Sequence, residues 1–134
     1  MAESLALLFP HVADTAGLIV RVAVSYLADQ SSPEAERWFW SYHIRIENER
    51  AEPVQLLARH WTIRDAHGNI HEVRGAGVVG ETPRIAPGES YDYVSGCPLN
   101  TPTGSMSGRY HMIDEAGSTF DISIPAFPLD GPAN

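Results

Sequence analysis

Apolar side chains recur at every second position in several stretches of the chain, which is the pattern of a β-strand that buries one face. The clearest stretches are 18–26, 38–46 and 119–124. Between such stretches lie residues that favour turns, for example DAHGN at 65–69 and the Pro-Gly pair at 87–88. The alternation therefore predicts short antiparallel strands joined by tight turns.

The periodicity of a long α-helix is missing from the sequence. Only the segment SSPEAERW, which begins at Ser31, favours a single helical turn, with Pro33 near its start. Strands with one polar face need a second sheet to cover their apolar face. The chain is therefore predicted to be all-β, an antiparallel sandwich of about seven strands, and only residues 1–16 and 129–134 look loosely specified.

Composition and charge narrow the set of partners. The 134 residues suffice for one domain with a single core. Nine Lys and Arg against seventeen Asp and Glu give a net charge of −8, which disfavours nucleic acid and anionic membranes as partners.

Cys97 is the only cysteine, so a disulfide within the chain and cysteine-based zinc clusters are excluded. Because no signal sequence or membrane span is apparent, we expect a soluble protein of the cytoplasm.

Three glycines, Gly75, Gly77 and Gly80, have the G-x-G-x-x-G spacing of dinucleotide-binding loops. In those loops the pyrophosphate lies at the N-terminus of the helix that follows. Here Pro83 and Pro87 exclude such a helix. We therefore interpret the glycines as bends, bulges or positions of positive φ where the chain crosses between sheets.

The glycine-rich loop has a second interpretation, as a binding site that needs no helix. Arg74 and Arg84 flank Gly75, Gly77 and Gly80, and this set is the candidate site for a di- or polyphosphate nucleotide. Guanidinium groups and loop N–H groups both favour anions. The structural interpretation is preferred, and the anion site is kept as its alternative.

Histidines and carboxylates raise the possibility of direct metal binding. His43, His60 and His111 are the candidate ligands for Co²⁺ or Mg²⁺, although no metal-binding spacing connects them. Surface or hydrogen-bonded histidines are the preferred interpretation, and no cofactor is assigned. Cys97 lacks a recognisable catalytic signature, and no pair of nucleophile and base is visible. We therefore expect no enzymatic activity, with a hydrolase as the remaining alternative.

Three segments of the sequence resemble the bacterial ApaG family. They are ARHWTIRDAHGNIHEVRGAGVVGETPRIAPGESYDYVSG, GSMSGRYHMID and FDISIPAFPL. The resemblance implies a fold like that of fibronectin type III and immunoglobulin domains. It also implies one domain over residues 17–129, an N-terminal extension at 1–16 and a tail at 130–134.

The same resemblance implies an association with Co²⁺ resistance and Mg²⁺ efflux, in a protein that is not itself a transporter. Related domains in eukaryotic F-box proteins and in a DNA polymerase delta-interacting protein imply a protein-binding role. The resulting hypothesis is a non-enzymatic interaction domain that binds a protein partner, still to be identified, through loops or an exposed sheet edge. An exposed edge strand is also suited to pairing with a second copy of the chain as a homodimer.

Overall fold

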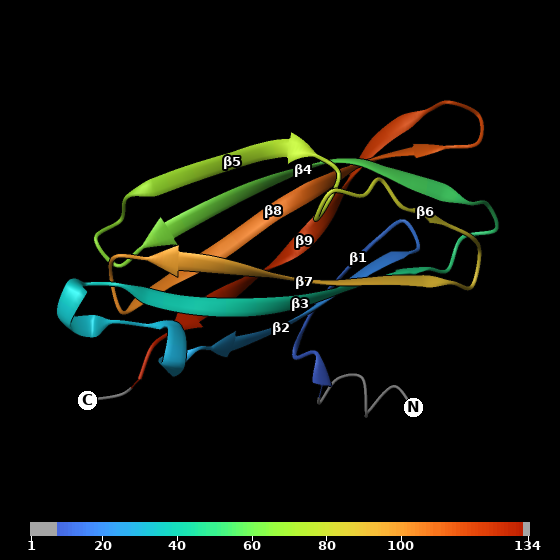
Figure 1. The fold of residues 1–134 in the computed structure, drawn as a ribbon. Coiled ribbons are helices and arrows are strands. Elements are labelled where there is room, and N and C mark those ends of the chain that lie inside the picture. Colours follow the sequence, from blue (N-terminus) through green and yellow to red (C-terminus); the bar gives the residue numbers. More distant parts are fainter. Residues whose placement is uncertain (1–7, 133–134) are drawn as a thin grey trace.

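Nine strands, counted over the residues that the structure describes, form two antiparallel sheets that face each other (Figure 1). The structure is a computed structural model and describes residues 8–132. The four-stranded sheet has the order β1 (His11–Thr15), β2 (Leu18–Tyr26), β3 (Trp38–Asn48) and β7 (Ser90–Leu99). The other sheet has the order β5 (Ile70–Ala76), β4 (Val54–Asp65), β8 (Thr103–Asp114) and β9 (Thr119–Asp130), and β6 (Arg84–Ile85) pairs with β4 beside β5. The predicted immunoglobulin-like antiparallel sandwich is confirmed.

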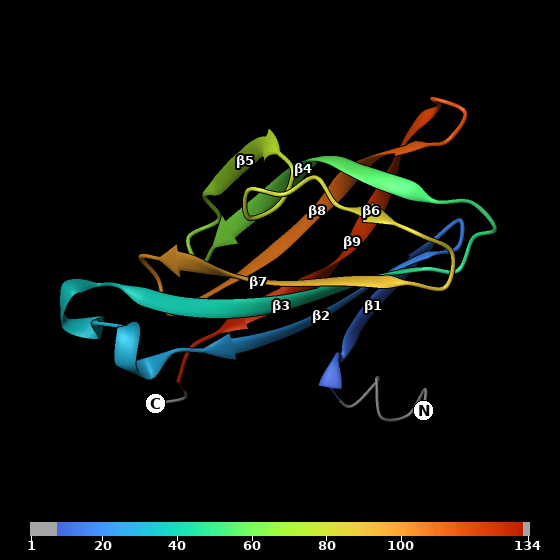
Figure 2. The same ribbon diagram turned by 45° about the vertical axis from the view of Figure 1, so that its right-hand side comes forward.

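The sandwich is closed along one side and open along the other. Strands β1 and β2 contact β9, so the first sheet packs against the second at that side. Strands β7 and β5 end the two sheets at the opposite side, and each pairs with one neighbour only (Figures 1 and 2). This open side therefore presents two edge strands, one from each sheet.

The core lies between the sheets and follows the alternation in the sequence. In β3 the inward positions are buried, whereas the residues between them are more exposed. The largest side chains with almost no exposed surface are Trp40, Tyr110, Phe127, Leu18, Ile44, Ile46, Leu56, Ile85, Met106, Met112, Ile122 and Leu129. Burying a large apolar side chain stabilises the fold by roughly 1.5–3 kcal/mol. The hydrophobic contacts of both sheets therefore hold the sandwich together.

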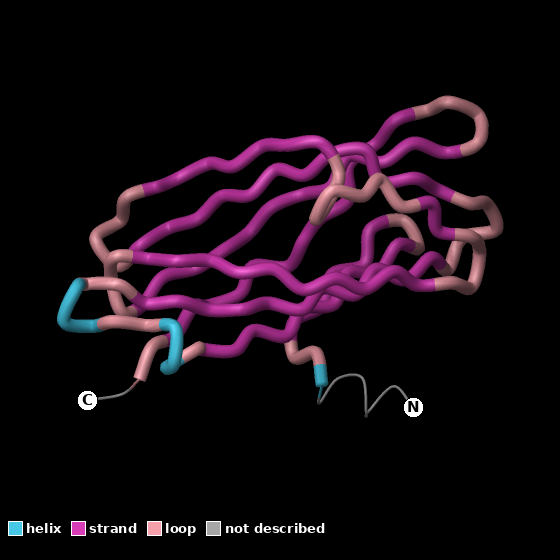
Figure 3. Tube along the Cα trace, in the orientation of Figure 1, coloured by secondary structure: helices cyan, strands magenta, loops and turns pink. Residues whose placement is uncertain are grey.

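Short turns connect most of the strands. In Figure 3 most of the chain is coloured as strand, and the loop and helix segments between the strands are short. Two 3-10 turns, η1 (Ala28–Gln30) and η2 (Pro33–Ala35), lie between β2 and β3. The second of them confirms the helical turn predicted near Pro33. Within residues 8–132, no helix has the length and apolar character that crossing a membrane requires.

The structure has more strands than the sequence pattern predicted, because β1 and β6 carry little hydrophobic signal. Strand β1 lies in the stretch expected to be loosely specified, and its apolar residue Val12 is exposed. Backbone pairing with β2 holds it instead, through a turn in which Ala16 and Gly17 both have positive φ. At the other end β9 extends to Asp130. Residues 1–7 and 133–134 of the two predicted ends lie outside the described residues.

Candidate functional site

A groove follows the open side of the sandwich, between β5 and β7. Its inner part is a hollow of about 400 Å³, and a second hollow of about 400 Å³ adjoins it, with Ile63 and Pro98 lining both. The inner hollow is lined by Tyr42, Arg59, Trp61, Ile63, Val73, Ser95, Gly96, Cys97, Pro98 and Met106. We call the two hollows together the edge groove.

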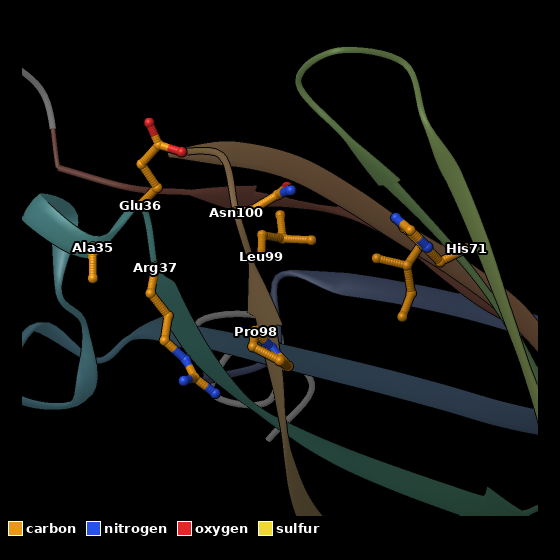
Figure 4. Close-up of a pocket in the computed structure, with 8 residues that line it drawn as sticks. Ala35, Glu36, Arg37, His71, Pro98, Leu99 and Asn100 are labelled. Carbon is orange, nitrogen blue, oxygen red and sulfur yellow. The ribbon is translucent and has the colours of Figure 1, made fainter.

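The outer part of the edge groove lies near the end of β7. Figure 4 shows Glu36 and Arg37, which follow η2, on one side of this hollow and His71 of β5 on the other. Leu99 lies between them in the same view. This part of the groove is therefore bordered by three segments that are distant in the sequence.

Arg59 is the charged residue of the inner hollow. It lies on β4, where its register partners are Gly75 on β5 and Tyr110 on β8. The Nη1 atom of Arg59 donates hydrogen bonds to the carbonyl oxygens of Ala76, at 3.1 Å, and Gly77, at 2.9 Å. None of the ion pairs in the described part of the chain involves Arg59. Its positive charge is therefore not balanced by a carboxylate there.

The ionisable groups that share the inner hollow with this guanidinium, Tyr42 and Cys97, are neutral at pH 7. Burial raises the pKa of Cys97 to about 11, and it also raises the pKa of Tyr42. Burial raises the pKa of Tyr93 and of Tyr110 as well, and the hydroxyl groups of these two residues hydrogen-bond each other. The inner hollow therefore carries a single positive charge among hydroxyl, thiol and apolar groups.

The glycine-rich loop is a tight turn. Val78 and Glu81 exchange two backbone hydrogen bonds of 2.8 Å, and the two residues between them, Val79 and Gly80, have φ of 42° and 81°. Two central residues with positive φ form the kind of turn that closes a β-hairpin. Gly77 has φ of 61°, and a Cβ atom there would lie 2.1 Å from the carbonyl oxygen of Glu81. These features support the structural interpretation of Gly77 and Gly80.

Gly75 has a different role from the other two glycines, because its φ is not positive. A Cβ atom at Gly75 would lie 2.9 Å from Nη1 of Arg59. Glycine therefore leaves the space that the Arg59 side chain occupies beside β5.

A second hollow, of about 320 Å³, lies on the outer face of the five-stranded sheet. It is lined by Ala58, Arg59, His60, Arg74, Gly75, Arg109, His111 and Asp121. His60 is the register partner of Arg74 on one side and of Arg109 on the other. Four predicted site residues, Arg74, Gly75, His60 and His111, thus lie around one hollow.

Carboxylates already contact the two histidines of this outer face. The Nε2 atom of His60 lies 3.1 Å from Glu72 Oε1 and 3.4 Å from Arg74 Nε, and Nδ1 of His111 lies 2.7 Å from Asp121 Oδ1. The same nitrogen of His60 either donates to Glu72 or accepts from Arg74, depending on whether it carries a proton. Across residues 8–132, His, Cys, Asp and Glu form no group of three that is suited to a metal ion.

The remaining predicted residues lie apart from this hollow. Arg84 pairs with Gln55 in register, whereas Arg74 pairs with His60, so the two arginines are roughly 15 Å apart along β4. The guanidinium of Arg84 bonds Glu115 at 3.0 Å. His43 belongs to the other sheet, where it contacts Asp92 at 2.7 Å.

Sequence reasoning missed the contribution of Arg59, Tyr42 and Ser95 to a site. One signal was present, because Arg59 has the same strand parity as the apolar residues Trp61 and Ile63, which line the inner hollow. An arginine at an inward position is rare without a partner or a role. The partner of Arg59, however, is backbone from β5, which the sequence pattern does not reveal.

Comparison with known proteins identifies the family. Residues 28–114 match the sequence profile of the ApaG domain family. The chain is 53% identical over 118 residues to Protein ApaG of Rhodospirillum centenum, covering 88% of this chain and 91% of that protein. It is 54% identical over 118 residues to Protein ApaG of Paramagnetospirillum magneticum, with the same coverage.

A solved structure agrees with these sequence matches. The crystal structure of the ApaA protein from Bordetella pertussis is similar with a TM-score of 0.84 and 44% identity, covering 87% of this chain and 95% of that chain. Similarity at this level extends over most of the chain. The chain therefore belongs to the ApaG family.

Proposed function

We propose that the chain is a non-enzymatic binding module that holds an extended segment of a partner protein in the edge groove. The observation that supports this most is the pair of edge strands, β5 and β7, on either side of a hollow with largely apolar walls. An edge strand offers free N–H and C=O groups to an additional strand. A segment that pairs with β5 or β7 directs every second side chain toward the hollow.

The side chains of the groove suit an extended segment with apolar residues. Val73 of β5 is 40% exposed and lines the inner hollow, whereas Trp61 and Met106 are buried at its base. Covering apolar surface of this kind stabilises a complex by roughly 25 cal/mol per Å² before the entropy of binding is subtracted. Val94 of β7 is 59% exposed but does not line the groove. Val94 therefore serves as a control for Val73, because both are exposed valines on an edge strand and only Val73 lines the groove.

Selection from a library of displayed peptides tests the proposal. The variant Val73→Glu places a charge in the groove, and Val94→Glu places the same charge outside it. We expect selected peptides to bind the unmodified chain and Val94→Glu alike, and to bind Val73→Glu at least about tenfold more weakly. Equal binding to both variants, or no enrichment of peptides at all, would contradict the proposal.

We place this activity in the cytoplasm and propose that any effect on Co²⁺ resistance and Mg²⁺ efflux is indirect, through the partner. A lone buried thiol is compatible with a reducing compartment. In a host whose cobalt tolerance depends on this chain, Val73→Glu is expected to lower tolerance and Val94→Glu to preserve it. Loss of tolerance in neither variant, at equal protein levels, would contradict a role for the groove in it.

A second candidate function is direct binding of an anion on the outer face of the five-stranded sheet. It is favoured by one observation, the convergence of Arg74 and Arg109 with His60 and His111 around the outer hollow. A thermal-shift titration with inorganic pyrophosphate, Co²⁺ and Mg²⁺ tests it, because a ligand that binds only the folded chain raises the melting temperature. A saturable shift with pyrophosphate that Arg74→Met abolishes would support this candidate, and no shift with pyrophosphate would exclude it, whereas a shift with Co²⁺ or Mg²⁺ alone would indicate metal binding instead.

A further inference from the structure

We propose that Arg59 is the receptor for a carboxylate side chain, an Asp or Glu of the partner segment that enters the edge groove. This inference rests on the proposed use of the groove and adds the chemistry that selects the partner. The predicted ligand is an extended peptide with an acidic residue beside an apolar one. No other residue of the inner hollow is charged at neutral pH.

The first step is the position of the guanidinium. Arg59 points inward from β4, and its Nη1 is held by the carbonyl groups of Ala76 and Gly77 at the end of β5. Two hydrogen bonds from one nitrogen fix the plane of the group. The Nε and Nη2 atoms make no hydrogen bond within residues 8–132, and neither is sealed from solvent. Arg59 is therefore anchored on one side and available on the other.

The second step is the charge. A guanidinium partly removed from water loses solvation, and carbonyl groups satisfy its hydrogen bonds without neutralising its charge. The surrounding hydroxyl and thiol groups do not neutralise it either, because Tyr42 and Cys97 retain their protons at neutral pH. A carboxylate that accepts two parallel N–H bonds neutralises the charge and fits the planar fork of arginine.

The third step is the class of anion. One guanidinium balances one carboxylate, whereas a phosphate dianion would leave excess negative charge between the sheets. Tyr42 and Ser95 add hydroxyl groups to the same hollow, and Trp61, Val73 and Met106 line it with apolar surface. The hollow thus combines one cation with hydroxyl donors and hydrophobic walls. These features favour an acidic side chain flanked by an apolar side chain.

The experiment uses two small probes of matching shape. Phenylacetate carries a carboxylate and an aromatic ring, whereas phenylacetamide has the same ring with a neutral amide. In an NMR titration of the full chain labelled with ¹⁵N, we expect phenylacetate to shift the Arg59 Nε–H signal and the amide signals of Val73 and Ser95 along a saturable curve. We expect phenylacetamide to shift them at least about tenfold less at equal concentration. Equal shifts with both probes, or no saturable shift with either, would overturn the proposal.

Variants assign the effect to Arg59. Arg59→Met removes the charge and is expected to abolish the response to phenylacetate, while Arg109→Met, on the outer face, preserves it. If Arg59→Met does not fold, Ser95→Asp provides the same test, because it places a carboxylate in the same hollow as Arg59 and is expected to weaken phenylacetate binding at least about tenfold. Unchanged binding by a folded Arg59→Met, or by Ser95→Asp, would contradict the assignment.

The peptide selection separates this inference from the proposed function. Selected peptides are expected to be enriched in Asp or Glu at one position, and replacing that residue by Asn or Gln is expected to weaken binding to the unmodified chain but not to Arg59→Met or Ser95→Asp. Peptides that bind in the groove without a preference for Asp or Glu would contradict the role of Arg59 as a carboxylate receptor, but they would still support the proposed binding module. A saturable phenylacetate response without any selected peptide would show that Arg59 binds a carboxylate, but it would remove the peptide module and with it the assignment of that carboxylate to a partner segment.

Discussion

The guanidinium of Arg59 packs against the backbone of Gly75. The two residues are register partners on β4 and β5, and a Cβ atom at Gly75 would lie 2.9 Å from Nη1 and 3.0 Å from Cζ and Nη2 of Arg59. The glycine thus creates the space in which the arginine crosses β5 and reaches the carbonyl groups of Ala76 and Gly77. The Arg59 side chain therefore accounts for a glycine at the first position of the G-x-G-x-x-G motif, Gly75.

Replacing Gly75 by alanine is expected to push the guanidinium out of its place. The guanidinium is the far end of a flexible side chain and can move, so the free energy of unfolding should fall by about 1 kcal/mol as its hydrogen bonds to Ala76 and Gly77 are lost. Denaturant unfolding measures this cost, and the Arg59 Nε–H signal reports the displacement. In an Arg59→Met background the same Gly75→Ala change should cost much less, because the flexible methionine moves aside. Equal costs in both backgrounds would show that Gly75 has another role.

The other two glycines of the motif lead to a prediction about the turn. Gly77→Ala should cost more than about 2 kcal/mol, because its Cβ atom would overlap the carbonyl oxygen of Glu81 and its φ is positive. Val79→Asn should instead stabilise the chain by up to about 1 kcal/mol, because φ of 42° is unfavourable for a β-branched residue and tolerated by asparagine. Thermal unfolding checks both directions. Destabilisation by Val79→Asn would mean that the valine side chain contributes contacts that outweigh its strain.

The buried hydroxyl pair of Tyr93 and Tyr110 gives a prediction about unsatisfied polar groups. Tyr110→Phe alone leaves the Tyr93 hydroxyl without its partner inside the core and should cost about 1–3 kcal/mol. Replacing both residues by phenylalanine should recover most of this loss, because neither polar group is then left unpaired. The double-mutant cycle is measured by denaturant unfolding. Strictly additive costs would indicate that the two hydroxyl groups do not depend on each other.

Cys97 gives the protein a pH dependence in the alkaline range. Burial raises the pKa of its thiol from 9.0 to about 11, so the folded chain keeps the proton after the unfolded chain has lost it. The contribution of this group to stability is fully present below pH 9 and is lost as the pH rises toward 11. The loss is about 3 kcal/mol, because the pKa rises by about two units and each pKa unit corresponds to about 1.4 kcal/mol. Unfolding free energies measured from pH 8 to 11 should therefore fall less steeply for Cys97→Ala than for the unmodified chain.

Tyr93 and Tyr110, whose pKa values are also raised by burial, add the same alkaline slope to both curves. The pKa of Tyr42 is raised by burial and in part by Cys97, so Cys97→Ala also reduces the alkaline slope that comes from Tyr42, in the same direction as the loss of the thiol. Parallel curves for Cys97→Ala and the unmodified chain would contradict the shifted thiol.

Most of the architecture could be predicted from the sequence because its signal is local. Alternation in β2, β3 and β9 identified the strands, and the turn residues at 65–69 identified the β4–β5 hairpin. The strands that the sequence pattern did not predict, β1 and β6, are held by backbone pairing with their neighbours. In β1 the apolar residue Val12 faces solvent, so periodicity carries no information about burial there.

The candidate site was much less accessible to prediction, because its parts come from distant segments. The Arg59 side chain shares the inner hollow with Tyr42 of β3, Val73 of β5 and Ser95 of β7. The motif at Gly75, Gly77 and Gly80 suggested a site with Arg74 and Arg84, which the register along β4 keeps apart. Strand periodicity specifies which face of each strand is apolar, whereas the order of the strands and the packing of the two sheets specify which inward residues meet. Those contacts depend on the whole sandwich, and they place the charged group of the groove on β4, outside the G-x-G-x-x-G motif.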